Sequence, residues 1–187
     1  MTEPPIYAEL GHAMPSGLTN ELKKRITEIT KLAIKALGIN HGAVNMDLLI
    51  TEKEQIFLVD IGARMGGNLI GSHIIPIGTG IDYMKILIKA AMGQKFNVEA
   101  EHPAKHVATR LLALNPGKVT GLPDFDAIKK KHQVEIFHHL KVGDIIREYQ
   151  NNLDGFGYVV ATANDIETAE LNAEKAKQQV DKSIIRG

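Results

Sequence analysis

The 187-residue sequence predicts an α+β fold, for three reasons. Apolar residues recur every three or four positions over residues 19–38, which is typical of an amphipathic helix. Two short β-branched runs then follow around a polar turn, which favours an antiparallel hairpin. Later residues form several short strand patterns and end in another helical pattern. The predicted order is helix, hairpin, helix and then a strand-rich module closed by a helix.

The first helix has clear start and stop signals. Thr19 is placed to cap its first turn, and Gly38 to end it. Its expected buried stripe consists of Leu22, Ile26, Ile29, Ala33 and Leu37. The hairpin comes next, with strands predicted at residues 42–50 and 56–61 and the polar residues 51–55 as the turn.

A glycine-rich loop at residues 62–68 leads into the apolar segment 69–80. A second helix is predicted from about Asp82 to Met92, stopped by Gly93. Few of its residues are charged, so we expect it to be largely buried. Its expected inward side chains are Met84, Leu87, Ile88 and Ala91.

The composition changes at residues 94–104, which are typical of a connector, and we therefore predict domains at residues 1–98 and 99–187. The second domain is expected to hold a turn-rich loop at residues 115–123 and a short helix at 124–132. Its strands are predicted within residues 104–114, 133–140, 142–149 and 155–163. The final helix opens at Asn164 or Asp165, and its expected buried face is Ala169, Ala173, Ala176, Val180 and Ile184.

Composition excludes several classes of function. Lys plus Arg number 22 and Asp plus Glu number 22, so the chain lacks the positive surplus that non-specific nucleic-acid binding requires. The sequence has no cysteine, which excludes disulfides, thiolate metal sites and a cysteine nucleophile. No apolar run approaches the roughly 18 residues of a membrane span. We expect a soluble, cytoplasmic protein that binds neither nucleic acid nor a membrane.

The strongest chemical signal is a pair of carboxylates in the hairpin. Pairing the strands around a turn between Lys53 and Glu54 places Asp47 opposite Asp60. Opposed side chains have Cβ atoms roughly 4.5–5.5 Å apart, where like charges repel. A shared divalent cation would relieve the repulsion, and Asn45 on the same face adds a neutral ligand. Alternatively, one Asp faces solvent and the other pairs with Arg64; the residues alone leave both interpretations open.

The loop after the second strand adds features that suit a ligand. Arg64 follows Asp60 by four residues, and a guanidinium there can hold a phosphate or a carboxylate through two hydrogen bonds. Gly62, Gly66 and Gly67 would let the backbone approach a ligand closely. The run GARMGG matches neither a P-loop nor the dinucleotide-binding pattern.

Other polar residues favour structural interpretations. His138 and His139 are adjacent in a predicted strand, so they face opposite sides and cannot share a metal. His73 follows the glycine loop and is a weaker candidate for a ligand contact. Arg110 is expected to form a structural salt bridge, with contact to an acyl substrate as the alternative.

The hairpin, the run LVDIGARMGGN and the run TGID resemble the C-terminal half of an ATP-grasp ligase, and residues 100–187 are similar to the C-terminal module of the same ligases. In that family, one strand carries an acidic residue and the next ends in an acidic-x-Asn-x-Arg motif. The resemblance implies that Asp47 and Asp60 hold Mg²⁺ (or Mn²⁺) against the ATP phosphates, and that Arg64 contacts phosphate or the acyl substrate and is the catalytic residue.

This sequence departs from the family pattern at two positions. Asp60 stands where Glu is usual and Gly62 where Asn is usual, so the resemblance leaves Asn45, Asn68 or water to replace a metal ligand. We assign Asn45 to the metal with the two aspartates, and we assign Gly66, Gly67 and Asn68 to ATP. The run HAMPS at residues 12–16 and the run DIGAR look like the amino-acid ligase branch.

The resemblance implies an ATP-dependent carboxylate–amine ligase that forms an acyl phosphate, with a small carboxylic acid and an amine as substrates and a homodimer as one assembly. In this family, the adenine pocket and the ATP-binding lysines lie upstream of the region that this chain resembles. We therefore expect a C-terminal fragment that is inactive alone, or a chain completed by a partner. The alternatives are a non-catalytic binding or assembly module with a degenerate core, and a carboxylase-type ATP-grasp ligase.

Overall fold

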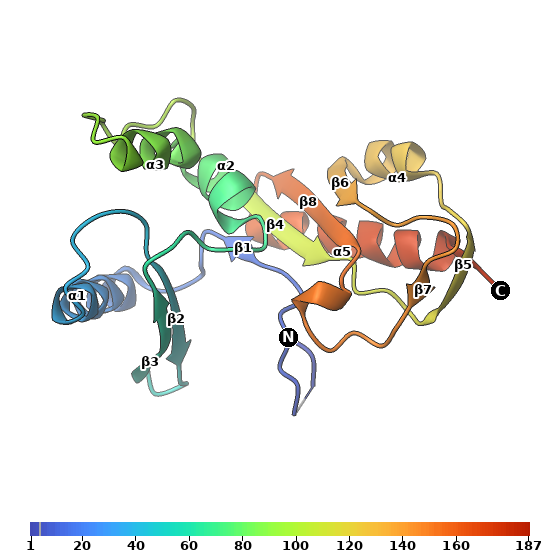
Figure 1. Cartoon of the computed structure of the whole chain (residues 1–187), viewed down its shortest axis with the longest axis horizontal. Coiled ribbons are helices and arrows are strands. Elements are labelled where there is room, and N and C mark those ends of the chain that lie inside the picture. The colour runs from blue at the N-terminus through green and yellow to red at the C-terminus, as the bar shows by residue number, and fades with distance from the viewer. Residues whose placement is uncertain (4) are drawn as a thin grey trace. The chain divides into compact units, whose positions relative to one another are not determined.

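The computed structural model describes residues 1–3 and 5–187 and divides into two compact units (Figure 1). One unit is Ser16–Pro103, and the other joins Met1–Pro15 to Ala104–Gly187. The α+β class is confirmed, because helices accompany sheets whose strand pairs are all antiparallel. The division into domains 1–98 and 99–187 stays a prediction; the compact units separate after Pro103 and group the first 15 residues with the later part of the chain.

The unit Ser16–Pro103 contains α1 (Asn20–Ala36), β2 (Asn45–Ile50), β3 (Ile56–Gly62), the π-helical turn η1 (Ile70–Ile74), α2 (Ile75–Thr79) and α3 (Tyr83–Ala91). The predicted cap of α1 is confirmed, since the Thr19 side chain accepts a hydrogen bond from the Leu22 backbone N–H at 3.2 Å. Gly38 ends the helix in the left-handed conformation, with φ +68°. Most of the predicted stripe faces inward, but Leu37 at its C-terminal end is exposed.

The hairpin of β2 and β3 has the predicted pairing at the end away from its turn. Asp47 lies directly opposite Asp60, and Asn45 opposite Gly62. The register shifts between Asp47 and Leu48, so that Leu48 pairs with Leu58 and Val59 has no opposite residue. This irregularity is a β-bulge. At the turn, Arg25 of α1 donates hydrogen bonds to the carboxylate and the carbonyl oxygen of Glu54, which ties helix and hairpin together.

The helix α3 begins as predicted, with the Asp82 side chain accepting from the Lys85 N–H at 3.0 Å. The prediction that it is largely buried is wrong. Ala90 is its only fully buried residue among those that the structure describes, while Ile88 is 56% exposed and Met84 is 37% exposed. Ala91 is exposed as well, so the predicted inward stripe is not the side that packs within this unit. An apolar helix face becomes buried only where another element packs on it, so composition alone does not predict the burial of α3.

The other unit is built on a four-stranded antiparallel sheet in the order β1 (Ala13–Met14), β4 (His106–Leu111), β8 (Gly157–Ala163) and β6 (Val134–His138). Helix α5 (Ile166–Ser183) packs on β4 and β8, and α4 (Phe125–His132) packs on α5 and β6. The predicted inward face of α5 is confirmed, since all of its expected residues are buried. Because three of them are alanines, the helix backbone lies close to the sheet.

Three short strands form a second sheet in the order β7 (Ile145–Ile146), β5 (Gly117–Gly121) and β9 (Ile185–Arg186). The prediction of a loop over residues 115–123 is wrong at its centre, where β5 pairs with β7 on one side and with β9 on the other. Glycines at both ends concealed this strand. A 3₁₀ turn, η2 (Asn152–Asp154), precedes β8. None of the helices described is long and apolar enough to span a membrane.

The half-buried Tyr149 ties the N-terminal residues to the rest of this unit. The Tyr149 hydroxyl donates to the Glu9 carbonyl oxygen at 2.6 Å and lies 2.9 Å from Asn152 Oδ1. Burial, with Tyr158 and Glu9 nearby, raises the pKa of Tyr149 from 10 to about 12. Since the unfolded chain loses this proton first, stability is expected to fall as pH rises from 10 towards 12. Phenolate absorbance in a pH titration checks the pKa, with Tyr149→Phe removing the late-ionising component and Tyr7→Phe, at an exposed position, leaving it.

Candidate active site

The candidate site lies on one face of the hairpin. Side chains alternate between the two faces of a strand, so Asn45, Asp47 and Leu49 share one face of β2. Their partners on β3 are Gly62, Asp60 and Phe57 in that order. Asp47 and Asp60 are both exposed. The predicted juxtaposition of the two carboxylates is confirmed, while their role in binding a metal stays a prediction.

Asn45 is held next to this pair. Its amide Nδ2 donates a hydrogen bond to Asp47 Oδ1 at 3.3 Å. This bond stabilises the Asp47 carboxylate, which lies opposite the carboxylate of Asp60. A Cβ atom on Gly66 would lie only 2.8 Å from Asn45 Oδ1 and 3.1 Å from Ile70 Cγ2. Position 66 therefore needs glycine for Asn45 and the start of η1 to keep their places.

This close contact yields a prediction for Gly66→Ala. The added methyl group must displace Asn45 or Ile70, and overpacking of this kind costs about 1–3 kcal/mol of stability. A matched control is Gly67→Ala, because a Cβ atom there would meet nothing within 4 Å. Thermal unfolding and the NMR signal of the Asn45 side-chain amide measure the effect. Equal melting temperatures and equal Asn45 amide signals in the two variants would show that the close contact at Gly66 does not hold Asn45 in place.

Arg64 lies just beyond β3 and is exposed. Its Nη1 donates to the Met65 carbonyl oxygen at 3.0 Å, and among the described residues no carboxylate lies within ion-pair distance of its guanidinium. The pairing of Arg64 with one of the two aspartates is therefore not seen. A Cβ atom on Gly62 would lie 3.4 Å from Arg64 Cγ, so the missing side chain at position 62 leaves room for the stem of the arginine.

The segment after Arg64 has an unusual backbone. Asn68 and Leu69 adopt left-handed conformations in succession, with φ +47° and +64°, and η1 follows directly. A bulky residue such as leucine rarely adopts this conformation, and such strain and π-helical turns are both frequent at functional sites. Within η1, Ser72 Oγ lies 2.8 Å from His73 Nδ1. The predicted nucleotide contacts of Gly66, Gly67 and Asn68 stay predictions, on a loop whose shape suits a ligand.

Sequence reasoning missed two residues on the same face of the hairpin. Leu49 and Phe57 are paired across the strands and are 58% and 53% exposed. They lie one side-chain repeat from the aspartates, so an apolar surface adjoins the acidic pair. Alternation from Asp47 would have found Leu49, but the bulge at Val59 changes the alternation on β3 and hides Phe57.

The donors at this site are chemically suited to a hard divalent cation. Two carboxylates and one amide provide oxygen ligands, and Mg²⁺ is typically bound by one or two carboxylates together with substrate phosphates. Among the described residues there is no group of three or more His, Cys, Asp and Glu side chains that could hold a metal ion. The two aspartates and Asn45 would therefore leave coordination positions for water or for phosphate oxygens.

Comparison with known proteins places this geometry in context. Residues 110–184 match the family model of the L-amino acid ligase C-terminal domain 2. The whole chain superimposes on 46% of the L-amino acid ligase from Bacillus licheniformis, with a TM-score of 0.81 and 21% sequence identity. The chain has the fold of the C-terminal part of ATP-grasp ligases.

Two further similarities support the assignment of the ATP-grasp fold. Phosphoribosylglycinamide synthetase from Anaerococcus prevotii matches 96% of the chain and 45% of its own length, with a TM-score of 0.76 and 20% identity. An uncharacterized protein of Sinorhizobium fredii, y4rH, is 24% identical over 97% of the chain and 38% of its own length. The chain thus spans less than half the length of these relatives.

Within residues 110–184, Arg110, His138 and His139 make structural contacts. The Arg110 guanidinium lies 3.2 Å from Glu174 Oε2 and 3.4 Å from Glu170 Oε1, both on α5, so the expected structural ion pair is confirmed. The two adjacent histidines contact different aromatic rings, His138 stacking on Phe125 and His139 on Phe156. Burial lowers the pKa of His138, with Lys129 adding to the effect.

Proposed function

We propose that this chain is the C-terminal part of an ATP- and Mg²⁺-dependent carboxylate–amine ligase. The observation that carries the proposal is the placement of Asp47 opposite Asp60, with Asn45 hydrogen-bonded to Asp47 and Arg64 two residues beyond the end of β3, in a chain with the fold of ATP-grasp ligases. The substrates would be a small carboxylic acid and an amine, and the match to an L-amino acid ligase domain favours amino acids over other acids. A cytoplasmic location and a homodimer belong to the same proposal.

The reaction would have two steps. An oxygen of the substrate carboxylate attacks the γ-phosphorus of ATP, the bond to the β-phosphate oxygen breaks, and ADP leaves. The amine then attacks the carbonyl carbon of the acyl phosphate, phosphate leaves, and the amine proton passes to solvent. Neither step needs a protein nucleophile, so positioning and charge carry the catalysis.

The residues of this chain would have distinct roles in those steps. Asp47, Asp60 and the amide of Asn45 would hold Mg²⁺ (or Mn²⁺), which when bound supplies positive charge against the phosphate oxygens. The Arg64 guanidinium would orient the transferred phosphoryl group or the acyl oxygen through paired hydrogen bonds. Gly66, Gly67 and Asn68 would line the nucleotide phosphates, and Leu49 with Phe57 would offer apolar surface to the base.

The exposed apolar surface of the unit Ser16–Pro103 supports a larger active site. Among the described residues only Leu22, Ile74 and Ala90 form its buried apolar core, yet both the hairpin and α3 expose large apolar side chains. Surfaces of this kind mark sites that another element covers. We propose that the rest of the nucleotide site packs here, on an upstream segment or on a partner chain.

Trapping of the acyl phosphate tests the proposal. The chain, together with the upstream segment or partner chain proposed above, is incubated with ATP, Mg²⁺, single amino acids and hydroxylamine in place of the amine. A hydroxamate and an equal amount of ADP are expected, and Arg64→Ala should abolish both while Arg64→Lys retains a part. ADP without hydroxamate would favour a carboxylase-type ligase that uses bicarbonate. Neither product, from a folded protein, would favour a non-catalytic assembly module.

A further inference from the structure

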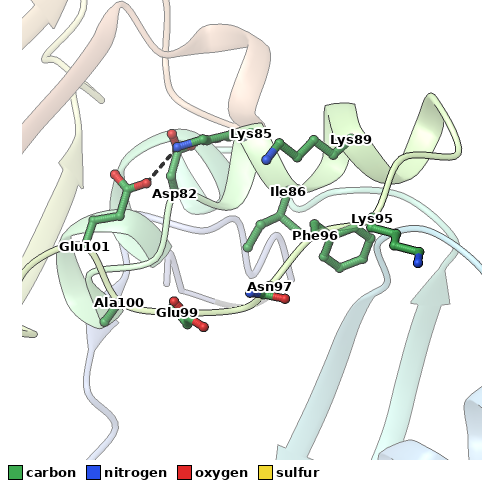
Figure 2. Close-up of a pocket in the computed structure, with 10 residues that line it drawn as sticks. All are labelled: Asp82, Lys85, Ile86, Lys89, Lys95, Phe96, Asn97, Glu99, Ala100 and Glu101. Atoms are coloured by element: carbon green, nitrogen blue, oxygen red, sulfur yellow. Dashed lines mark hydrogen bonds and ion pairs between the residues drawn. The ribbon is translucent and has the colours of Figure 1, made fainter.

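A groove of about 430 Å³ lies between α3 and the segment by which the chain returns after the helix (Figure 2). Asp82, Lys85, Ile86 and Lys89 line it from the helix. The returning segment, Lys95–Glu101, runs alongside the helix and forms the other wall. We call this segment the strap. The volume lies within the usual range of small-molecule sites, about 300–1,000 Å³.

The strap is fixed at both ends. At its start, Gly93 is left-handed with φ +67°, and the Gln94 N–H donates to the Lys89 carbonyl oxygen at 2.9 Å. At its far end, the Glu101 N–H donates to the Gly80 carbonyl oxygen at 2.7 Å, and Lys85 Nζ lies 2.9 Å from Glu101 Oε1. The groove is therefore built by the fold and is not formed by a loose chain end.

The middle of the strap offers unused hydrogen-bonding groups. From Lys95 to Ala100, the backbone N–H and C=O groups make no hydrogen bond to any described residue. Unpaired backbone groups of this kind can hydrogen-bond to the backbone of a peptide, as exposed sheet edges do in many peptide-binding domains. Between the walls, Ile86 and the 40%-exposed Phe96 provide an apolar surface.

The charges that line the groove have both signs. Lys85 is neutralised by Glu101, whereas Lys89, Lys95 and Glu99 have no ion-pair partner among the described residues. In Figure 2 the Lys89 side chain runs back along the helix towards Lys85. A ligand that matches this lining carries one negative and one positive group with an apolar side chain between them.

The spacing limits the size of that ligand. Lys95 and Glu99 are four residues apart, so their backbone positions are separated by at most about 13 Å. A free amino acid spans about 3.5 Å, whereas a dipeptide or tripeptide spans about 7–10 Å and leaves a gap that the long lysine and glutamate side chains bridge. We propose that this groove binds the zwitterionic form of a short apolar peptide, with its carboxylate on the lysines, its ammonium on Glu99 and its backbone on the strap. The site is separate from the hairpin and does not depend on the proposed function.

Titration of the intact chain with phenylalanyl-leucine, followed by amide chemical shifts in NMR, tests the proposal. Shifts are expected at residues 82–101, with millimolar affinity because the charges are exposed. Lys89→Gln and Glu99→Gln should each weaken binding by about three- to fivefold, as exposed ion pairs are worth up to about 1 kcal/mol. A matched control, Lys24→Gln on the exposed side of α1, should leave the affinity unchanged.

A capped peptide, N-acetyl-phenylalanyl-leucine amide, keeps the apolar groups and loses both charges, so it should bind at least fivefold more weakly. Free leucine should bind more weakly still. If the capped peptide binds as well as the zwitterion, the charge assignment is overturned. If residues 82–101 show no shifts with the dipeptide while the spectrum remains that of the folded chain, the groove is not a peptide site.

Discussion

Replacing Asp60 by Asn should lower the kcat of the proposed ligase by about 100-fold or more, the scale on which a lost transition-state electrostatic contact acts. The stability of the fold should not fall. Asp60 faces Asp47 directly across the hairpin, and like charges at opposed positions destabilise a sheet by a few tenths to about 1 kcal/mol. Removing one charge relieves that repulsion. Initial-rate kinetics and thermal unfolding of the same preparation measure the two effects.

These opposite signs separate a functional role from a structural one. If Asp60 served the fold, for example as an ion-pair partner, Asp60→Asn would lower both activity and melting temperature. A matched control is Asp126→Asn, at a carboxylate that is 92% exposed and, among the described residues, pairs only with Lys129 on its own helix. The control should retain full activity. A variant Asp60→Asn with unchanged kcat would remove Asp60 from the site.

Leu112→Ala should destabilise the sheet-based unit by about 2–5 kcal/mol, the usual cost of truncating a buried leucine. Leu112 follows β4 and is completely buried in the core that β4, β8 and α5 enclose. Its backbone also pairs with the start of β8, with the Leu112 N–H donating to the Gly157 carbonyl oxygen and the Leu112 carbonyl oxygen accepting from the Phe156 N–H. Alanine keeps these backbone bonds, so the loss measures packing alone.

Urea unfolding followed by circular dichroism measures this loss. The same substitution at Leu171, which is 51% exposed on α5, serves as the control and should change the stability by less than about 1 kcal/mol. Equal effects of the two substitutions would mean that Leu112 does not lie in the core that the structure shows.

Local sequence patterns predicted those elements that carry their own signals. The caps at Thr19 and Asp82 mark helix starts because their side chains bond to the backbone of the next turn. The opposition of Asp47 and Asp60 was predicted by counting across a turn. The strand pairs next to the turn are one residue out of that count, and the bulge at Val59, between the turn and the aspartates, restores it. The buried face of α5 was also predicted correctly, because its apolar residues recur every three or four positions.

Features that depend on a distant neighbour could not be predicted in this way. The burial of α3 was predicted from composition, but burial needs a partner surface, and Ile88 has none within its unit. Strand β5 was missed because its glycines resemble a turn, and only pairing with β7 and β9 makes it a strand. The close contact of Gly66 with Asn45 joins a strand to a loop that follows the hairpin, which no local pattern describes.

Binding of Mn²⁺ to this chain, followed by the electron paramagnetic resonance signal of the free ion, tests the central claim most directly. The claim is that the hairpin carboxylates form a divalent-cation site. Wild-type chain and Asp126→Asn should bind one ion with the same affinity, while Asp47→Asn and Asp60→Asn should each bind at least tenfold more weakly, as expected when one of two charged ligands is lost. Equal affinities for all four proteins, each shown to be folded, would contradict it.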